Sequence, residues 1–162
     1  MDFFNKSEQS ILLNAENIIV GFSGGVDSTL VLAATNQFLE AHNKKNCLTA
    51  LHVNHQTQCD SSSWQIHCEK FCKEHNINFS CKSVEIKESG QGYEAAARSA
   101  RLDIFNAFDE ATVIILGHHL DDQVETVFFR VLRGTGLKGL TGMQRHLKIK
   151  DKDFIRPLLH LI

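Results

Sequence analysis

The chain has 162 residues, of which 43% are hydrophobic and 22% are charged, and its formal net charge is −2. These values are typical of a globular protein, and they exclude a disordered chain, a collagen-like repeat and a disulfide-stapled miniprotein. We expect residues 1–162 to form one domain.

Charge is unevenly distributed along the chain. Residues 1–129 hold 9 Lys and Arg against 17 Asp and Glu, whereas residues 130–162 hold 8 Lys and Arg against 2 Asp. A basic segment suits contact with a polyanion such as RNA, but charge alone fits a solvated, Lys-rich loop equally well.

The chain carries no signal for export or for membrane insertion. Its apolar runs are too short to cross a bilayer, and residues 1–6 lack the layout of a secretion signal. We therefore expect a cytoplasmic protein with no membrane partner, whose five cysteines stay as thiols. Because residues 158–162 are mostly apolar, we also expect more chain to follow in the full protein.

Short apolar runs alternate with helical periodicity. Strands are predicted over residues 18–22, 47–54, 79–86 and 112–117, and helices over residues 28–42, 61–75, 93–109 and 121–133. This order predicts an α/β fold with a doubly wound, mostly parallel sheet, which binds ligands beyond the carboxyl ends of its strands. After residue 133 we predict a glycine-rich loop and at most one strand.

The first predicted strand runs directly into a glycine-rich turn. The turn reads Ser23, Gly24, Gly25, Val26, Asp27 and Ser28. Adjacent glycines let backbone N–H groups approach an anion at a helix start, and a carboxylate there suits a Mg²⁺ ion that also binds phosphate oxygens. The alternative is a simple Gly-Gly turn in which Asp27 caps the helix. The six positions together favour a nucleotide site.

The fourth predicted strand is followed by a second polar segment, residues 117–126. Its helix has an apolar stripe that we expect to face the sheet, formed by Leu120, Val124, Val127, Phe128 and Val131. Asp122 and Glu125 lie away from that stripe on neighbouring turns, where they can share a site, and His118 is placed to orient a phosphate or carboxylate. Alternatively, the acidic residues only complement the helix dipole, or the segment belongs to a dinuclear metal hydrolase.

Residues 23–28 resemble the PP-loop of the ATP pyrophosphatases. The chain also resembles the tRNA(Ile)-lysidine synthetase family, over residues 52–55, 94–101, 117–143 and 155–159. It departs from the pattern of that family at Phe22, Gln56 and Thr57. The resemblance implies a Rossmann-like fold of the adenine nucleotide alpha hydrolase type. It also implies ATP and Mg²⁺ as cofactors, a tRNA(Ile) with a CAU anticodon and free L-lysine as partners, and a possible homodimer.

The activity implied by the resemblance is ligation of lysine to C2 of the wobble cytidine through an adenylated tRNA. In that interpretation Asp27 holds Mg²⁺, Arg98 stabilises negative charge, and Asp122 and Glu125 orient the lysine amine and take its proton. The resemblance also assigns His52 and Asn54 to ATP binding.

Three alternatives to these assignments remain open. Arg98 could simply pair with Glu94 on a solvated helix face. The chain could be a tRNA thiolase, although Cys68 and Cys72 are expected to fill space beside Ile66 and Phe71, and Trp64 is expected to pack as well. Finally, it could be a module that binds adenine nucleotides without turnover.

Overall fold

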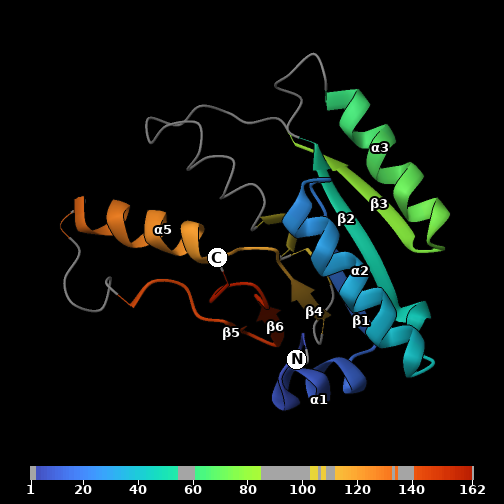
Figure 1. Ribbon diagram of the computed structural model, residues 1–162, viewed down its shortest axis with the longest axis horizontal. Helices are drawn as coiled ribbons and strands as arrows, with labels where there is room; N and C mark the ends of the chain where they lie inside the picture. The colour runs from blue at the N-terminus through green and yellow to red at the C-terminus, as the bar shows by residue number, and fades with distance from the viewer. Residues whose placement is uncertain are drawn as a thin grey trace.

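The computed structural model describes residues 3–54, 61–84, 103–105, 107–108, 112–132, 134 and 141–161. Figure 1 shows its helices and strands. The helices are α1 (Lys6–Asn14), α2 (Val26–Ala41), the 3₁₀ turn η1 (Lys45–Cys47), α3 (Ser61–Glu74) and α5 (Leu120–Leu132). The strands are β1 (Asn17–Gly21), β2 (Leu48–Asn54), β3 (Asn78–Ser83), β4 (Thr112–Ile115), β5 (His146–Ile149) and β6 (Lys152–Ile155).

The six strands form one sheet in the order β3-β2-β1-β4-β6-β5. All neighbouring strands are parallel except β5 and β6, which form an antiparallel hairpin. The predicted doubly wound, mostly parallel sheet is thus confirmed. Successive strands run outward from β1 to β3, and the chain then returns to the other side of β1 as β4. The winding therefore reverses between β1 and β4, where such sheets bind ligands.

Two apolar clusters sandwich the sheet. Alternate β1 residues contribute to each, because neighbouring side chains of a strand point to opposite faces. Ile18 and Val20 join Val31 and Leu39 of α2 in one cluster, while Ile19 joins other buried side chains on the opposite side. The members of this second buried cluster are Ile19, Leu51, Phe105, Ile114 and Phe154.

The structure corrects the prediction at both ends of the chain. Helix α1 was not expected; it begins with a capping box, in which the Asn5 side chain accepts from the Glu8 N–H and the Glu8 carboxylate accepts from the Asn5 N–H. Beyond residue 141 the chain forms two strands instead of at most one. The β5–β6 hairpin turns at Lys150, which adopts a positive φ of 54°.

The other predicted elements agree to within a few residues with those described. The predicted helix over residues 93–109 falls largely outside the described residues, which include only 103–105 and 107–108 of it. None of the described helices is both long and apolar enough to span a membrane.

Candidate functional site

The turn between β1 and α2 leaves the first N–H groups of a helix uncovered by any capping side chain. Gly24 has a φ of +88°, which L residues rarely adopt, and Gly25 is the N-cap residue of α2 without a side chain to offer. The first N–H groups of a helix have no intrahelical acceptor. This turn therefore presents backbone donors at the positive end of the α2 dipole.

Two serine hydroxyls brace the turn from within. The Ser28 hydroxyl donates to the Gly25 carbonyl at 3.0 Å and lies 3.0 Å from the Ser23 hydroxyl, while the Ser23 N–H donates to Ser28 Oγ at 3.3 Å. The Ser23 hydroxyl oxygen in turn accepts from the Gly25 N–H at 3.3 Å. These bonds engage both hydroxyls within the turn, and a contact of Ser23 or Ser28 with a phosphate stays a prediction.

Helix α3 supports the same turn from outside. A Cβ atom added to Gly24 would lie 2.9 Å from Cys68 Sγ and 3.1 Å from Trp64 Cε3, so only glycine fits there. Trp64 remains 48% exposed and Ile66 65% exposed. Trp64 thus packs against the turn on one side while remaining half exposed, and the expectation that Ile66 packs beside the cysteines is wrong. Cys68 and Cys72 are fully buried, as predicted.

His52 and Asn54 lie on β2 beside the turn and are both buried. His52 Nδ1 lies 2.9 Å from the Phe22 carbonyl oxygen, which only accepts, so Nδ1 carries the proton. Asn54 Nδ2 donates to Gln65 Oε1 at 3.3 Å. These contacts tie the turn and the start of α3 to β2, and a direct contact of either residue with ATP stays a prediction.

The segment after β4 lies directly against the beginning of α2. A Cβ atom on Gly117 would lie 3.1 Å from the Ser28 nitrogen and 3.2 Å from the Asp27 carbonyl carbon. The two predicted strand-to-helix junctions therefore meet at the point where the winding reverses.

His119 lies between carboxylates from both junctions. Its Nε2 atom is 3.8 Å from Asp27 Oδ2 on α2 and 3.6 Å from Asp122 Oδ2 on α5. The His119 N–H donates to Asp122 Oδ2 at 2.8 Å, and the Asp121 N–H donates to His119 Nδ1 at 3.2 Å. The sequence prediction placed Asp27 at the first junction and Asp122 with Glu125 at the second. It missed His119, because two adjacent histidines give no sign of which one faces the neighbouring junction.

The other predicted catalytic residues are His118, Glu125 and Arg98. His118 is half-buried and takes part in a polar or ring interaction, Glu125 is exposed on α5, and Arg98 lies outside the described residues. Within the described part of the chain, no three His, Cys, Asp or Glu side chains are grouped so as to hold a metal ion by themselves. A dinuclear hydrolase would need such a set.

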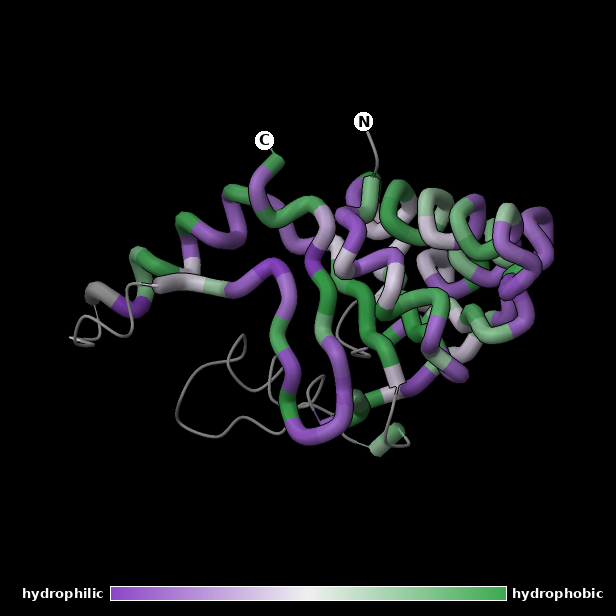
Figure 2. Tube along the Cα trace, turned by 90° about the horizontal axis from the view of Figure 1, so that it is seen from below, coloured by the Kyte–Doolittle hydropathy of each residue, from purple (hydrophilic) through white to green (hydrophobic). Residues whose placement is uncertain are grey.

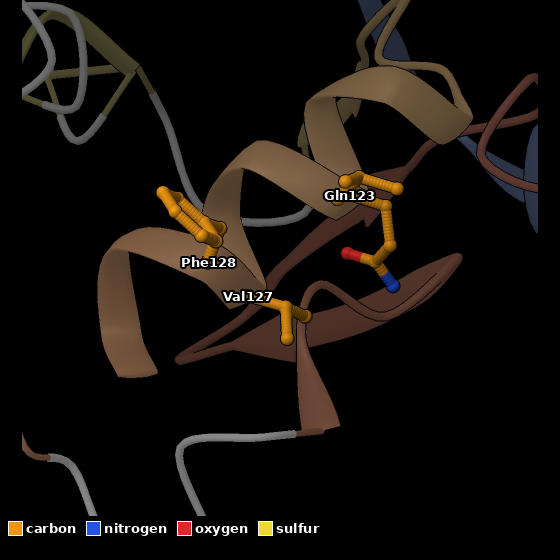
Figure 3. A pocket seen from close by; sticks show the side chains of 4 residues that line it. Gln123, Val127 and Phe128 are labelled. Carbon is orange, nitrogen blue, oxygen red and sulfur yellow. The ribbon is translucent and has the colours of Figure 1, made fainter. Parts of the chain in front are cut away.

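The apolar stripe of α5 does not face the sheet as predicted. Val124 is 61% exposed and Phe128 60% exposed. With Gln123 and Val127 they line an open apolar depression (Figure 3). The helix instead projects away from α2 and α3 (Figure 1). Polar side chains of α5 attach it to the rest of the fold.

Polar contacts attach α5 to the chain ahead of β5. Gln123 accepts from the Met143 N–H at 2.6 Å and donates to the Met143 carbonyl at 2.8 Å. Arg130 donates to the Gly142 carbonyl at 3.0 Å. Gly142 has a φ of +65°, and an added Cβ would collide with the Gln123 amide at 2.7 Å. These paired contacts between polar groups explain why the apolar residues of α5 are left outward.

Several of the basic side chains that the structure describes in residues 130–162 are engaged within the fold. Arg145 binds Glu8, Lys152 is buried, and Arg130 and Arg156 donate to backbone carbonyls. Lys148 and Lys150 remain exposed at the tip of the β5–β6 hairpin, which Figure 2 shows as a hydrophilic turn. A polyanion that approached this side would thus meet the hairpin tip.

Cys68 and Cys72 are poorly suited to sulfur chemistry. Burial raises the pKa of Cys68 to about 11 and that of Cys72 to about 12, and neighbouring thiols add to both shifts. Since the thiolate is the reactive form, these two groups are inert near neutral pH. Cys59 lies outside the described residues.

Comparison with known proteins agrees with this geometry. The family model described as a PP-loop domain matches residues 2–162. A tRNA(Ile)-lysidine synthase of Legionella pneumophila (strain Paris) is 41% identical over 148 residues, which cover 89% of this chain and 33% of that protein. One from Francisella philomiragia is 36% identical over 146 residues, which cover 88% of this chain and 35% of that protein.

A solved structure has the same fold. The U34-tRNA thiolase NcsA from Methanococcus maripaludis, solved with its [4Fe-4S] cluster, superposes with a TM-score of 0.64 at 20% identity, covering 97% of this chain and 59% of that one. The chain spans about a third of the length of the lysidine synthases that it matches. The adjoining strand-to-helix junctions and the match over residues 2–162 show that this chain belongs to the PP-loop domain family.

Proposed function

We propose that this chain is the ATP-binding part of an enzyme that ligates lysine to C2 of the wobble cytidine in a tRNA(Ile) with a CAU anticodon. The observation that carries the proposal is the meeting of the two junctions, with Asp27 of the PP-loop and Asp122 of α5 on either side of His119. Its similarity to lysidine synthases along almost the whole chain supports the choice of reaction.

In the first step the C2 oxygen of the cytidine attacks the α-phosphorus of ATP. A P–O bond forms to the α-phosphorus, the bond to the bridging oxygen of the β-phosphate breaks, and pyrophosphate leaves. Negative charge on the phosphate chain needs donors that are already oriented. The uncapped N–H groups at the start of α2 fit that need, and Arg98 is proposed as a further positive charge.

In the second step the lysine ε-amine attacks C2, a C–N bond forms, and the C2–O bond breaks to release AMP. The amine has an ordinary pKa of about 10.4 in water, so it must lose a proton before it can attack. Asp122 and Glu125 are one turn apart on α5. We assign them to orient the ammonium group and to accept this proton, with His118 beside them.

The donor set at the junctions fits a Mg²⁺ ion that is bound partly by substrate. Mg²⁺ usually takes one or two carboxylates together with phosphate oxygens and water. Asp27, whose side chain is 51% exposed, and Asp122 are two carboxylates that lie near the turn, one on each side of His119. When bound, the ion would neutralise charge on the phosphates, and Asp27 is its proposed ligand.

The proposed RNA-facing surface is the basic segment 130–156. The exposed side chains of Lys148 and Lys150 at the hairpin tip support it. Contacts of this kind bind phosphate without reading sequence, so the recognition of tRNA(Ile) would need other parts of the protein. We accordingly expect the 162-residue chain to bind ATP and to fail in lysine transfer when it is assayed alone.

The experiment supplies the full-length protein, of which this chain is the proposed ATP-binding part, with ATP, Mg²⁺, radiolabelled lysine and tRNA(Ile) bearing CAU. The proposal expects label in the tRNA together with equimolar pyrophosphate, and loss of both in Asp27→Ala. Control tRNA with a CAC anticodon should stay unlabelled. Sulfur incorporation in place of lysine would support the thiolase alternative, and nucleotide binding with no pyrophosphate under any condition would support a non-catalytic module.

A further inference from the structure

We propose that His119 is a positioning residue of the nucleotide site, which holds the Asp27 and Asp122 carboxylates in a fixed relation to one another. This inference rests on the proposed function for its substrate, a nucleoside triphosphate. The geometry itself comes from contacts that span the two junctions.

The orientation of the His119 ring is fixed by its backbone neighbours. The Asp121 N–H donates to Nδ1 at 3.2 Å, so Nδ1 is an acceptor and the proton of the neutral ring lies on Nε2. The His119 N–H donates to Asp122 at 2.8 Å, which anchors the backbone of the same residue. The Nε2–H group consequently points to the space between the two carboxylates.

The Nε2 atom of His119 lies near both carboxylates and forms a direct hydrogen bond with neither. Distances of 3.8 Å to Asp27 and 3.6 Å to Asp122 exceed those of a direct hydrogen bond but lie within the range of an electrostatic contact. Throughout the described residues, His119 is the one basic side chain within 4.0 Å of either carboxylate. Without the ring, Asp122 would keep the backbone N–H of residue 119 as a donor, but no described basic side chain would lie within 4.0 Å of either carboxylate to offset their negative charge.

The close approach of the backbone at Gly117 is what brings His119 within reach of Asp27. Gly117 lets the chain after β4 approach the first turn of α2, where an added Cβ would lie 3.1 Å from the Ser28 nitrogen. Two residues later the ring of His119 reaches Asp27. The side chain is 31% exposed, as suits a group beside a ligand site and not one in the core.

Affinity for a nucleotide is the measurement that tests the proposal. The ligand is α,β-methylene-ATP with Mg²⁺, which cannot be cleaved at the bond in question, and the signal is the fluorescence of Trp64, the single tryptophan of the chain. We expect His119→Ala to weaken binding about tenfold, the loss typical of a contact to a charged group. His119→Gln, whose amide N–H can replace Nε2–H, should stay within about threefold of wild type. His160→Ala, at an exposed histidine, is the matched control and should bind as wild type does.

A second measurement needs no variant and does not depend on turnover. Nitrogen NMR of histidine-labelled wild-type protein should show His119 as the Nε2–H tautomer, with its signals shifted when the analogue and Mg²⁺ are added. Wild-type affinity in His119→Ala, a Gln variant as weak as the Ala variant, or an Nδ1–H ring would overturn the proposal. Normal results here, with no lysine transfer by the full-length protein, would count against the proposed function alone.

Discussion

The guanidinium of Arg145 binds both carboxylate oxygens of Glu8, although 137 residues separate them in the chain. Arg145 Nε donates to Glu8 Oε1 at 2.7 Å and Nη2 donates to Oε2 at 3.0 Å. The same guanidinium donates to the carbonyls of Phe3 and Pro157. Glu8 is 1% exposed, so this is a buried ion pair that joins α1 to the chain on either side of the β5–β6 hairpin.

Removing one partner of this pair should destabilise the fold strongly. Arg145→Ala leaves a buried carboxylate without its cation, and we expect the free energy of unfolding to fall by about 3–5 kcal/mol. Urea denaturation followed by circular dichroism measures it. Lys45→Ala is the control, since Lys45 pairs with the exposed Glu40 at 3.4 Å and its loss should cost less than about 1 kcal/mol. Equal losses in the two variants would contradict the buried-pair interpretation.

Gly24 is constrained both by its backbone conformation and by its neighbours. Gly24→Ala must adopt a φ near +88° and push against Cys68 and Trp64. Gly134→Ala meets only the first cost, because its φ is +67° and no described atom lies within 4 Å of its added Cβ. We expect a loss in unfolding free energy of about 1 kcal/mol for Gly134→Ala and at least about 2 kcal/mol for Gly24→Ala.

Thermal melts of the two glycine variants and wild type provide the comparison. A fluorescence change of Trp64 should accompany Gly24→Ala but not Gly134→Ala, because the new methyl group touches the indole. If Gly24→Ala is no less stable than Gly134→Ala, the packing of α3 on the PP-loop is not tight.

The sheet and its two junctions could be predicted because their signals are local. Apolar runs such as that of β1 are continuous where a strand is covered on both faces, and Gly24 and Gly25 mark the turn that follows. Parallel strands place their carboxyl ends along one edge, so a ligand site was expected beyond that edge. The approach of Asp27 and Asp122 to His119 was not itself predicted, because it depends on how closely the two junctions pack.

The errors arose where distant contacts decide the structure. Helix α1 has a weak apolar pattern, and its place is set both by the burial of Leu12 in the core and by the pairing of Glu8 with the distant Arg145. The apolar stripe of α5 is clear in the sequence, yet the bonds from Gln123 to Met143 fix the helix with its stripe outward. Periodicity identifies an apolar face of a helix but not the surface that covers it.

Replacing an exposed and a buried phenylalanine by alanine should give very different losses of stability. Phe128 is 60% exposed, and Phe128→Ala should change the free energy of unfolding by no more than about 0.5 kcal/mol. Phe154 is 2% exposed in β6, and Phe154→Ala should cost about 3–5 kcal/mol. Chemical denaturation of both variants tests this. A large loss for Phe128→Ala would mean that its ring is covered in solution.

The buried thiols of Cys68 and Cys72 should make the fold sensitive to alkaline pH. Their pKa values are about 11 and about 12, against an ordinary value of 9.0. Above pH 9 the unfolded chain loses these protons while the folded chain keeps them, so the unfolded state gains stability as the pH rises. The contribution of both thiols is therefore complete below pH 9 and is lost progressively between pH 9 and the folded pKa values.

At pH 10 the two thiols together should have lowered the free energy of unfolding by about 3 kcal/mol relative to pH 8. Lysine and tyrosine side chains also titrate in this range, so urea denaturation must compare wild type with the double variant Cys68→Ala, Cys72→Ala at both pH values. The double variant starts from a lower stability because it loses buried atoms, but its drop between pH 8 and pH 10 should be smaller than that of wild type. Both thiols are fully buried, so they should ionise less easily in the folded chain than in the unfolded one. Equal drops in the two proteins would contradict this prediction.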